Sequence, residues 1–247
     1  MVGARDFPRR IVCLSAEAAD ILHRLGETDR LVGVSAYADI PGIPRVSGFS
    51  TANLQRVLEL RPDLVIAYSY VQRELVTELI RAGVNVLVTH QTTLEEVADV
   101  MGMLARLVGR SSDALVEQFW RGLEPVRRDG PLPRVYFEEW PEPPVTGVAW
   151  VSELIERAGG VDIFADLRTG KTAAERCVTD AEILRRRPDI VIASWCGRAV
   201  DVGAIQRRLP GRVVFEVASE EILQPGPRLV EGYRRLCAIL DGWARNH

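Results

Sequence analysis

Two stretches of the chain carry nearly the same pattern. Residues 58–69 read LELRPDLVIAYS, and residues 184–195 read LRRRPDIVIASW. In each copy an amphipathic helical pattern meets a proline, which lacks an N–H group and disfavours α geometry in the residue before it. An aliphatic run follows at once, which is typical of a parallel strand covered on both faces. A single copy would be a common helix-to-strand connection, whereas two copies in matching halves predict two αβ lobes.

The rest of the chain extends this organisation. Strand and helix patterns alternate up to residue 90 and again from residue 134, a rhythm that predicts parallel sheets with right-handed crossovers. Between them lie two successive helical patterns, and we expect the second, 111–128, to be one stiff helix roughly 27 Å long. The expected domains are an N-terminal αβ lobe (1–109), an interlobe helix (110–130) and a C-terminal αβ lobe (131–247).

Composition excludes several classes of protein. The 247 residues are 47% hydrophobic and 26% charged, with a net charge of −3 and no dense basic run, so we expect no nucleic-acid partner. No apolar run is long enough to span a membrane, and no leader-like stretch opens the chain. We therefore expect a cytoplasmic protein, or a periplasmic or membrane-anchored one if a leader was removed. The four cysteines show no C-x-x-C spacing, which favours free thiols.

Aromatic residues follow the predicted strands. Six of the ten Trp and Tyr residues do so: Tyr37, Tyr68, Tyr70, Trp140, Trp150 and Trp195. Ligands of parallel sheets bind beyond the carboxyl ends of the strands, so these rings predict an interlobe cleft for a broad, flat, partly apolar ligand. Packing of the rings on their own lobe is the alternative for about half of them. Gln224, in a rigid Pro-rich loop, is a further candidate ligand contact.

A second group of residues has the chemistry of metal ligands. Its members are His90, Glu138, Glu139, Cys177 and Cys196. Imidazole, carboxylate and thiolate suit a borderline metal, but no spacing motif joins them. His90 is equally explained as a hydrogen-bonded loop residue, or as an axial ligand to a metal already held in a chelate. Cys196 and His90 lack an orienting carboxylate, so we expect no catalytic residues, no catalytic cofactor and no enzyme.

The chain resembles the helical-backbone (class III) periplasmic binding proteins. The resemblance rests on five stretches: RIVCLSAEAADIL from residue 10, GVSAYADIP from 33, NLQRVLELRPDLVIA from 53, SELIERAGGVDIFADL from 152 and RPDIVIA from 187. That family serves ABC importers of iron siderophores, haem and cobalamin, and the cobalamin branch is the most similar. The resemblance implies an α/β fold of two lobes joined by a single long rigid helix. By position, Tyr37 and Phe49 match cleft-lining aromatics of cobalamin-binding members.

The positions implied to dock on a permease depart from the family. Importer-docking members carry a glutamate on each lobe, where this chain has Gln55 and Ala181, with Asp180 and Glu182 as neighbours of the second. We therefore expect a non-docking binding protein for a corrinoid (cobalamin) or a related iron or metal chelate. The first alternative is the substrate-binding component of a cobalamin or iron-siderophore ABC importer. The second is direct transition-metal binding by His90, Glu138 or Glu139, and Cys196.

Overall fold

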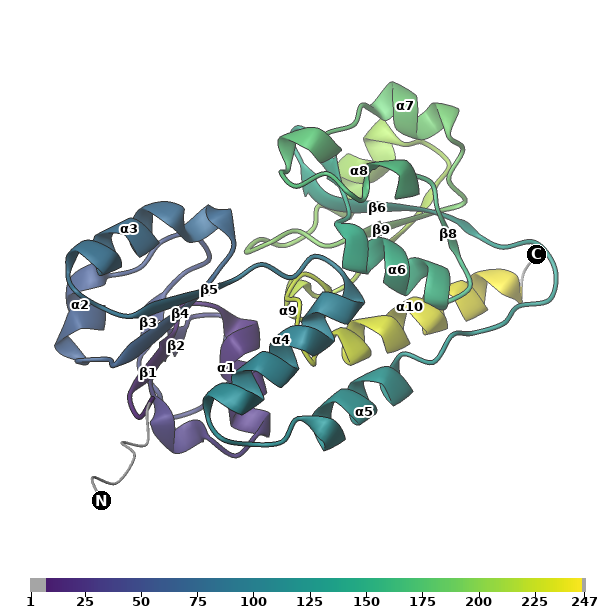
Figure 1. The fold of residues 1–247 in the computed structure, drawn as a ribbon. Coiled ribbons are helices and arrows are strands. Elements are labelled where there is room, and N and C mark those ends of the chain that lie inside the picture. The colour runs from purple at the N-terminus through teal and green to yellow at the C-terminus, as the bar shows by residue number, and fades with distance from the viewer. Residues whose placement is uncertain (1–7, 246–247) are drawn as a thin grey trace, which may run out of the picture. The chain divides into compact units, whose positions relative to one another are not determined.

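The computed structural model describes residues 8–245. The chain divides into two compact units, each built on its own sheet. Among the described residues, the first unit comprises 8–91 and Glu95–Gln118, and the second comprises Thr92–Leu94 and 119–245. Two αβ units with predominantly parallel sheets confirm the fold class expected from the sequence (Figure 1). In the part of the chain that the structure describes, no helix has the length and apolar character needed to cross a bilayer.

The first unit contains a five-stranded parallel sheet with the strand order β3-β2-β1-β4-β5. Its strands are β1 (Ile11–Cys13), β2 (Leu31–Ser35), β3 (Arg45–Ser47), β4 (Leu64–Tyr68) and β5 (Val86–Thr89). Its helical segments are α1 (Ala16–Arg24), η1 (Thr28–Arg30), α2 (Leu54–Glu59), η2 (Tyr70–Gln72), α3 (Arg73–Arg81) and most of α4 (Leu94–Leu107). Figure 1 shows α2 and α3 on one side of this sheet and α1 on the other, so both faces are covered.

Burial in the first unit follows the aliphatic runs. Val12 of β1 and Val65 of β4 are fully buried and pack with Val57 of α2 and Leu79 of α3. Gly33 of β2 permits a close approach, because a Cβ atom there would lie 2.8 Å from Leu60 Cδ1. The aliphatic strand pattern therefore produces the expected sheet covered on both faces.

The second unit contains a mixed sheet with the order β10-β9-β6-β7, and β8 pairs with β6. Its strands are β6 (Arg134–Pro141), β7 (Pro144–Thr146), β8 (Val161–Asp162), β9 (Ile190–Ala193) and β10 (Val213–Glu216). Only the β6–β7 pair is antiparallel among the described strands, and the sequence pattern suggested a loop there. The remaining segments are α6 (Ala149–Arg157), η3 (Ala165–Leu167), η4 (Ala174–Arg176), α7 (Asp180–Arg185), α8 (Val202–Arg208), α9 (Ser219–Ile222) and α10 (Leu229–Ala244).

The repeated Arg-Pro-Asp motif has the same structure in both units. The arginine before each proline has a positive φ angle, 47° at Arg61 and 50° at Arg187. In the first copy Arg10 Nη2 donates to Leu60 O (2.6 Å), and Asp63 Oδ1 accepts from the Arg10 amide (3.0 Å). The first strand is thereby joined to the end of α2.

The second copy uses equivalent groups. Arg134 Nη2 donates to Arg186 O (2.6 Å), and Asp189 Oδ2 accepts from the Arg134 amide (2.8 Å). In both copies an arginine side chain therefore satisfies helix-end carbonyl groups that have no partner within the helix. The sequence repeat is thus a structural repeat.

The helix expected over 111–128 is shorter than predicted. The observed helix α5 spans Asp113–Gly122, about 15 Å at the standard rise. Pro125 lacks the N–H group that a continuing helix needs, and it disfavours α geometry at Glu124. At the end of α5, a Cβ atom on Gly122 would lie 2.5 Å from Val230 Cγ1 of α10, so this close contact requires glycine.

Candidate functional site

Three aromatic side chains are exposed at the carboxyl edge of the first unit's sheet. Tyr37 follows β2, Phe49 follows β3 and Tyr70 follows β4. Their exposed fractions are 39%, 46% and 42%, which is high for large apolar side chains. The strands are parallel, so their carboxyl ends meet at one edge, where ligands of such sheets bind. We call these three residues the aromatic edge.

A buried glutamine connects the loops at this edge. Gln72 is 3% exposed, and its Nε2 donates to Leu14 O (3.1 Å) and to Phe49 O (2.9 Å). Its Oε1 accepts from the backbone amide of Tyr68 (2.9 Å). One side chain therefore ties together the segments that follow β1 and β3 and the end of β4. Sequence reasoning missed Gln72, because a glutamine beside a helical pattern carries no signal of burial.

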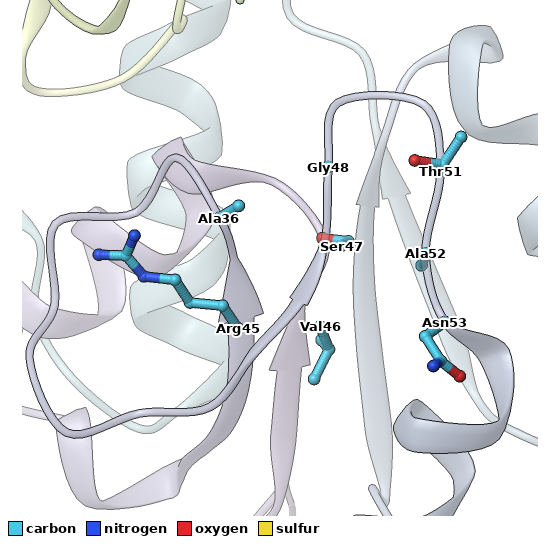
Figure 2. Close-up of a pocket in the computed structure, with 8 residues that line it drawn as sticks. All are labelled: Ala36, Arg45, Val46, Ser47, Gly48, Thr51, Ala52 and Asn53. Carbon is cyan, nitrogen blue, oxygen red and sulfur yellow. The ribbon is translucent and has the colours of Figure 1, made fainter.

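A hollow of about 520 Å³ lies in the same unit, beside the loop that carries Phe49. Figure 2 shows the residues that line it: Ala36, Arg45, Val46, Ser47, Gly48, Thr51, Ala52 and Asn53. Two of its polar groups already have partners within the unit, since Ser47 Oγ donates to Leu14 O (3.3 Å) and Asn53 Oδ1 caps α2 by accepting from the Arg56 amide (3.0 Å). The hollow lies at the carboxyl end of β3 and thus adjoins the aromatic edge.

Tyr68 is less exposed than the three residues of the aromatic edge. It is the last residue of β4 and only partly exposed, and its hydroxyl donates to Gln91 O (3.1 Å). His90 follows β5 and is exposed. Both lie at the carboxyl end of the sheet, as the strand patterns predict.

At the carboxyl edge of the second unit's sheet, two tryptophans lie next to one arginine. Trp140 belongs to the end of β6, and Trp195 follows the neighbouring strand β9. The guanidinium carbon of Arg198 lies 5.4 Å from the ring centroid of Trp140 and 5.0 Å from that of Trp195. Trp140 is partly exposed and Trp195 is 3% exposed. This edge therefore combines aromatic rings with a positive charge.

Glu138, suggested from the sequence as a metal ligand, is a buried carboxylate with partners inside the unit. It is 0% exposed and pairs with Arg208 Nη2 at 2.8 Å. The Tyr136 hydroxyl (3.1 Å) and Trp195 Nε1 (3.3 Å) also donate to it. Burial, together with the charge of Glu138, raises the pKa of Tyr136 well above its ordinary value. Arg208 also pairs with Asp180 (2.9 Å), so the cluster links β6, α7 and α8.

Glu139 is paired as well. Arg176, which is 5% exposed, donates to it from Nη1 (2.5 Å) and Nη2 (3.4 Å). Burial of Cys196, and secondarily the charge of Glu139, raises the pKa of the Cys196 thiol, which disfavours the thiolate needed for metal binding or nucleophilic attack. Cys177 is exposed, and its thiol donates to Ala173 O (3.3 Å).

The proposed metal ligands do not form a metal site. Within residues 8–245 no group of three or more His, Cys, Asp or Glu side chains is arranged to hold a metal ion. Glu138 and Glu139 are held by Arg208 and Arg176, respectively. Adjacent strand residues face opposite ways, which explains why the two carboxylates have different partners.

Trp150, which the sequence suggested as a ligand contact, is a buried residue of the second unit. It lies in the first turn of α6 and is 4% exposed. Its Nε1 donates to Ile222 O (2.9 Å) in the same unit. The amphipathic spacing of α6 directs this ring into the core. Gln224, in the loop after α9, is partly exposed.

The residues at the positions implied for docking are exposed. Gln55 of α2 donates to Glu59 Oε1 (3.1 Å), one turn away. In α7, Ala181 lies between two acids that already have partners: Asp180 pairs with Arg208, and Glu182 pairs with Arg185 and Arg186. Nearby arginines of the chain therefore neutralise the acids beside Ala181.

The fold and the aromatic residues at the carboxyl edges of the two sheets are typical of a ligand-binding α/β protein. Residues 11–210 match the family model described as periplasmic binding protein, and the chain belongs to that family. The vitamin B12-binding protein of Vibrio cholerae is 28% identical, over 96% of this chain and 91% of the relative. That of Yersinia pestis is also 28% identical, over 92% of this chain and 85% of the relative. These findings confirm the resemblance stated from the sequence.

Solved structures of other proteins have a similar fold. The crystal structure of the periplasmic vitamin B12 binding protein of Vibrio cholerae has a TM-score of 0.72 and 26% identity, over 97% of this chain and 98% of the other. A periplasmic heme-binding protein from Roseiflexus has a TM-score of 0.77 at 19% identity, over 96% and 99%, and shows the shared fold alone. The family and these relatives are periplasmic, so the expectation of a cytoplasmic location was wrong.

Proposed function

We propose that this protein is the substrate-binding component of an importer for a corrinoid of the vitamin B12 type, or for a closely related planar metal chelate. The observation that carries the proposal is the aromatic edge, where Tyr37, Phe49 and Tyr70 are exposed after three different parallel strands. The names of the vitamin B12-binding relatives support the corrinoid as the first candidate among planar chelates.

The physical argument is one of surface chemistry. Three rings that remain 39–46% exposed leave apolar area in water, and covering such area contributes about 25 cal/mol per Å². A flat macrocycle can cover several rings at once, and the tyrosine hydroxyls can accept or donate hydrogen bonds at its polar rim. Gln72 holds the loop of Phe49 in place before the ligand arrives, which lowers the ordering cost of binding.

We also propose a permease as the partner. Membership of a family whose model is described as periplasmic binding protein supports such a partner more strongly than Gln55 and Ala181 oppose it. The exposed ends of α2 and α7, where these two residues lie, are the candidate docking surfaces. On α2 the exposed acid Glu59 lies one turn from Gln55. It supplies the negative charge that a glutamate at position 55 would otherwise provide.

Calorimetric titration with cyanocobalamin tests the ligand. We expect saturable binding by the unaltered protein, and at least tenfold weaker binding by the double variant Tyr37→Ser, Phe49→Ser, because two ring contacts are lost. Ile80→Ser is the matched control. This side chain is 61% exposed but lies in the last turn of α3, which returns to the amino end of the parallel strands.

A parallel titration with hemin identifies the preferred chelate. Tighter binding of hemin than of cyanocobalamin would move the assignment to the haem branch of the same site. Absence of binding heat and of any thermal shift with both compounds would overturn the proposal. A weakening by Ile80→Ser equal to that of the double variant would show that the aromatic edge is not the contact surface.

A further inference from the structure

The side chain of Arg198 is held against two indole rings. Its guanidinium carbon lies 5.4 Å from the Trp140 centroid and 5.0 Å from the Trp195 centroid. The two tryptophans come from neighbouring strands, β6 and β9, which pair in parallel. Arg198 is exposed and follows β9 by five residues, so it lies at the carboxyl edge of the second unit's sheet. Cation–π contacts with two rings restrict a side chain that would otherwise be mobile.

Among the described residues of the second unit, no carboxylate pairs with Arg198. The two acids in β6 have other partners, since Glu138 pairs with Arg208 and Glu139 pairs with Arg176. No carboxylate in residues 8–245 forms an ion pair with Arg198. Arg198 thus differs from Arg176 and Arg208, whose charges are matched by these carboxylates.

The arrangement of the Arg198 guanidinium group against the two rings favours one class of ligand group. A guanidinium group that contacts aromatic rings through its faces keeps its N–H groups at the rim of the plane. These donors match the spacing of two oxygens on a carboxylate or a phosphate. The restricted side chain loses less rotamer freedom on binding than a free one does. Ligands of such sheets bind at this carboxyl edge.

We propose that Arg198, positioned by Trp140 and Trp195, binds an anionic oxygen group on the rim of the ligand. The inference rests on the proposed function and deepens it. It requires a planar chelate that carries a phosphate or carboxylate at its periphery. A corrinoid with a nucleotide loop supplies a phosphodiester, and haem supplies carboxylates. The two sources share the same chemistry and are separated by experiment.

The experiment compares four proteins by calorimetry: the unaltered chain, Arg198→Gln, Arg198→Lys and the control Arg207→Gln. Arg207 is an exposed arginine of α8 whose ion pair with Asp201 is long, at 4.0 Å. The ligands are cyanocobalamin, dicyanocobinamide, which lacks the phosphodiester, and hemin. Circular dichroism and thermal melting verify that each variant is folded.

We expect Arg198→Gln to weaken binding of the anionic ligand by roughly tenfold or more. Arg198→Lys should lose less, because it keeps the charge but not the planar fork. Arg207→Gln should bind as the unaltered chain does. If the phosphodiester is the group bound, dicyanocobinamide should bind all four proteins with similar affinity. If Arg198 binds the carboxylates of haem, Arg198→Gln should bind hemin more weakly than the unaltered chain does.

Other outcomes overturn the inference. Equal affinity of Arg198→Gln and the unaltered chain for cyanocobalamin and hemin refutes the anion subsite and leaves the proposed function intact. Arg198→Gln could also lose the same affinity for cyanocobalamin and dicyanocobinamide while its affinity for hemin is unchanged. That result would show that Arg198 acts through ring packing alone, and it would also refute the anion subsite. If the unaltered chain binds none of the three ligands, the proposed function fails together with the inference.

Discussion

The side-chain amide of Gln72 donates a hydrogen bond of 2.9 Å to the backbone carbonyl of Phe49. Gln72 is 3% exposed, whereas the Phe49 side chain is among the exposed apolar residues of the chain. A buried amide thus holds the backbone from which an exposed ring projects. The same amide group also bonds to Leu14 and Tyr68, so the shape of this edge depends on one side chain.

Replacing Gln72 with leucine should destabilise the protein and weaken ligand binding. The side-chain volume is similar, but three hydrogen bonds are lost and the buried Leu14 carbonyl loses its Gln72 donor. At about 1 kcal/mol per bond, we expect the free energy of unfolding to fall by roughly 2–4 kcal/mol. Urea denaturation measures this loss, and calorimetry with cyanocobalamin measures the affinity.

Gln55→Leu is the control for Gln72. Gln55 is exposed on α2, and its side-chain amide donates one hydrogen bond, to Glu59. Its replacement should change the unfolding free energy by at most about 0.5 kcal/mol. If the two variants unfold at the same urea concentration, Gln72 does not support the edge as described.

Arg208 and its neighbour Arg207 provide a matched pair in the second unit. Arg208→Met leaves the fully buried Glu138 without its counter-charge, whereas Arg207 forms only a 4.0 Å contact with Asp201. Breaking a buried ion pair costs about 3–5 kcal/mol, so Arg208→Met should be strongly destabilised. Arg207→Met should remain within about 0.5 kcal/mol of the unaltered chain. Chemical denaturation measures both.

A compensating change tests the cause of that loss. Arg208→Met combined with Glu138→Leu removes both charges of this ion pair, and the double variant should be more stable than Arg208→Met alone. A double variant that is no more stable would show that the Arg208 side chain contributes through packing and not through its charge.

Glu17 should make the stability of the protein depend on pH. It is 6% exposed, and burial raises its pKa from 4.5 to about 7. The folded state therefore holds this proton more tightly than the unfolded state does, so Glu17 stabilises the fold at low pH. That contribution is lost as pH rises from about 4.5 to about 7, by roughly 3 kcal/mol at most.

Unfolding free energies at about pH 5 and about pH 8 test this. Relative to Glu17→Gln, which keeps a neutral side chain, the unaltered protein should lose stability as pH rises. The control is Glu74→Gln on α3, where the side chain is 89% exposed. A constant difference between the unaltered chain and Glu17→Gln across this range would contradict the prediction.

Much of the fold follows from local sequence. The Arg-Pro-Asp repeats at residues 61–63 and 187–189 are followed by buried strands, and both copies use equivalent arginine and aspartate hydrogen bonds. Proline and aliphatic runs act on neighbouring residues, which is why their effect can be predicted from the sequence. The sequence predicts too long a helix for α5, because the helical spacing of apolar residues continues past Gly122. The observed helix ends at Gly122, since Pro125 lacks the N–H group that a further helical turn needs.

The candidate site was predicted in part. Tyr37 and Tyr70 are exposed at the carboxyl ends of strands, where the strand patterns place them. Phe49 was expected only from the family resemblance, because the strand before it, β3, was not predicted from the sequence. Trp150 occupies an equivalent place in the pattern but is buried. Local sequence does not distinguish Trp150 from the three exposed rings, because the burial of a ring depends on which distant residues pack over it.

From the sequence alone, the chain is determined to be a two-unit α/β protein with aromatic residues at the carboxyl ends of its strands. Tertiary structure decides which of those residues can meet a ligand. Glu138 is bound by Arg208, 70 positions later, and Gln72 reaches Leu14, 58 positions earlier. These partners come together only when the sheets form, because burial and charge pairing are properties of contacts between remote segments and not of sequence neighbours.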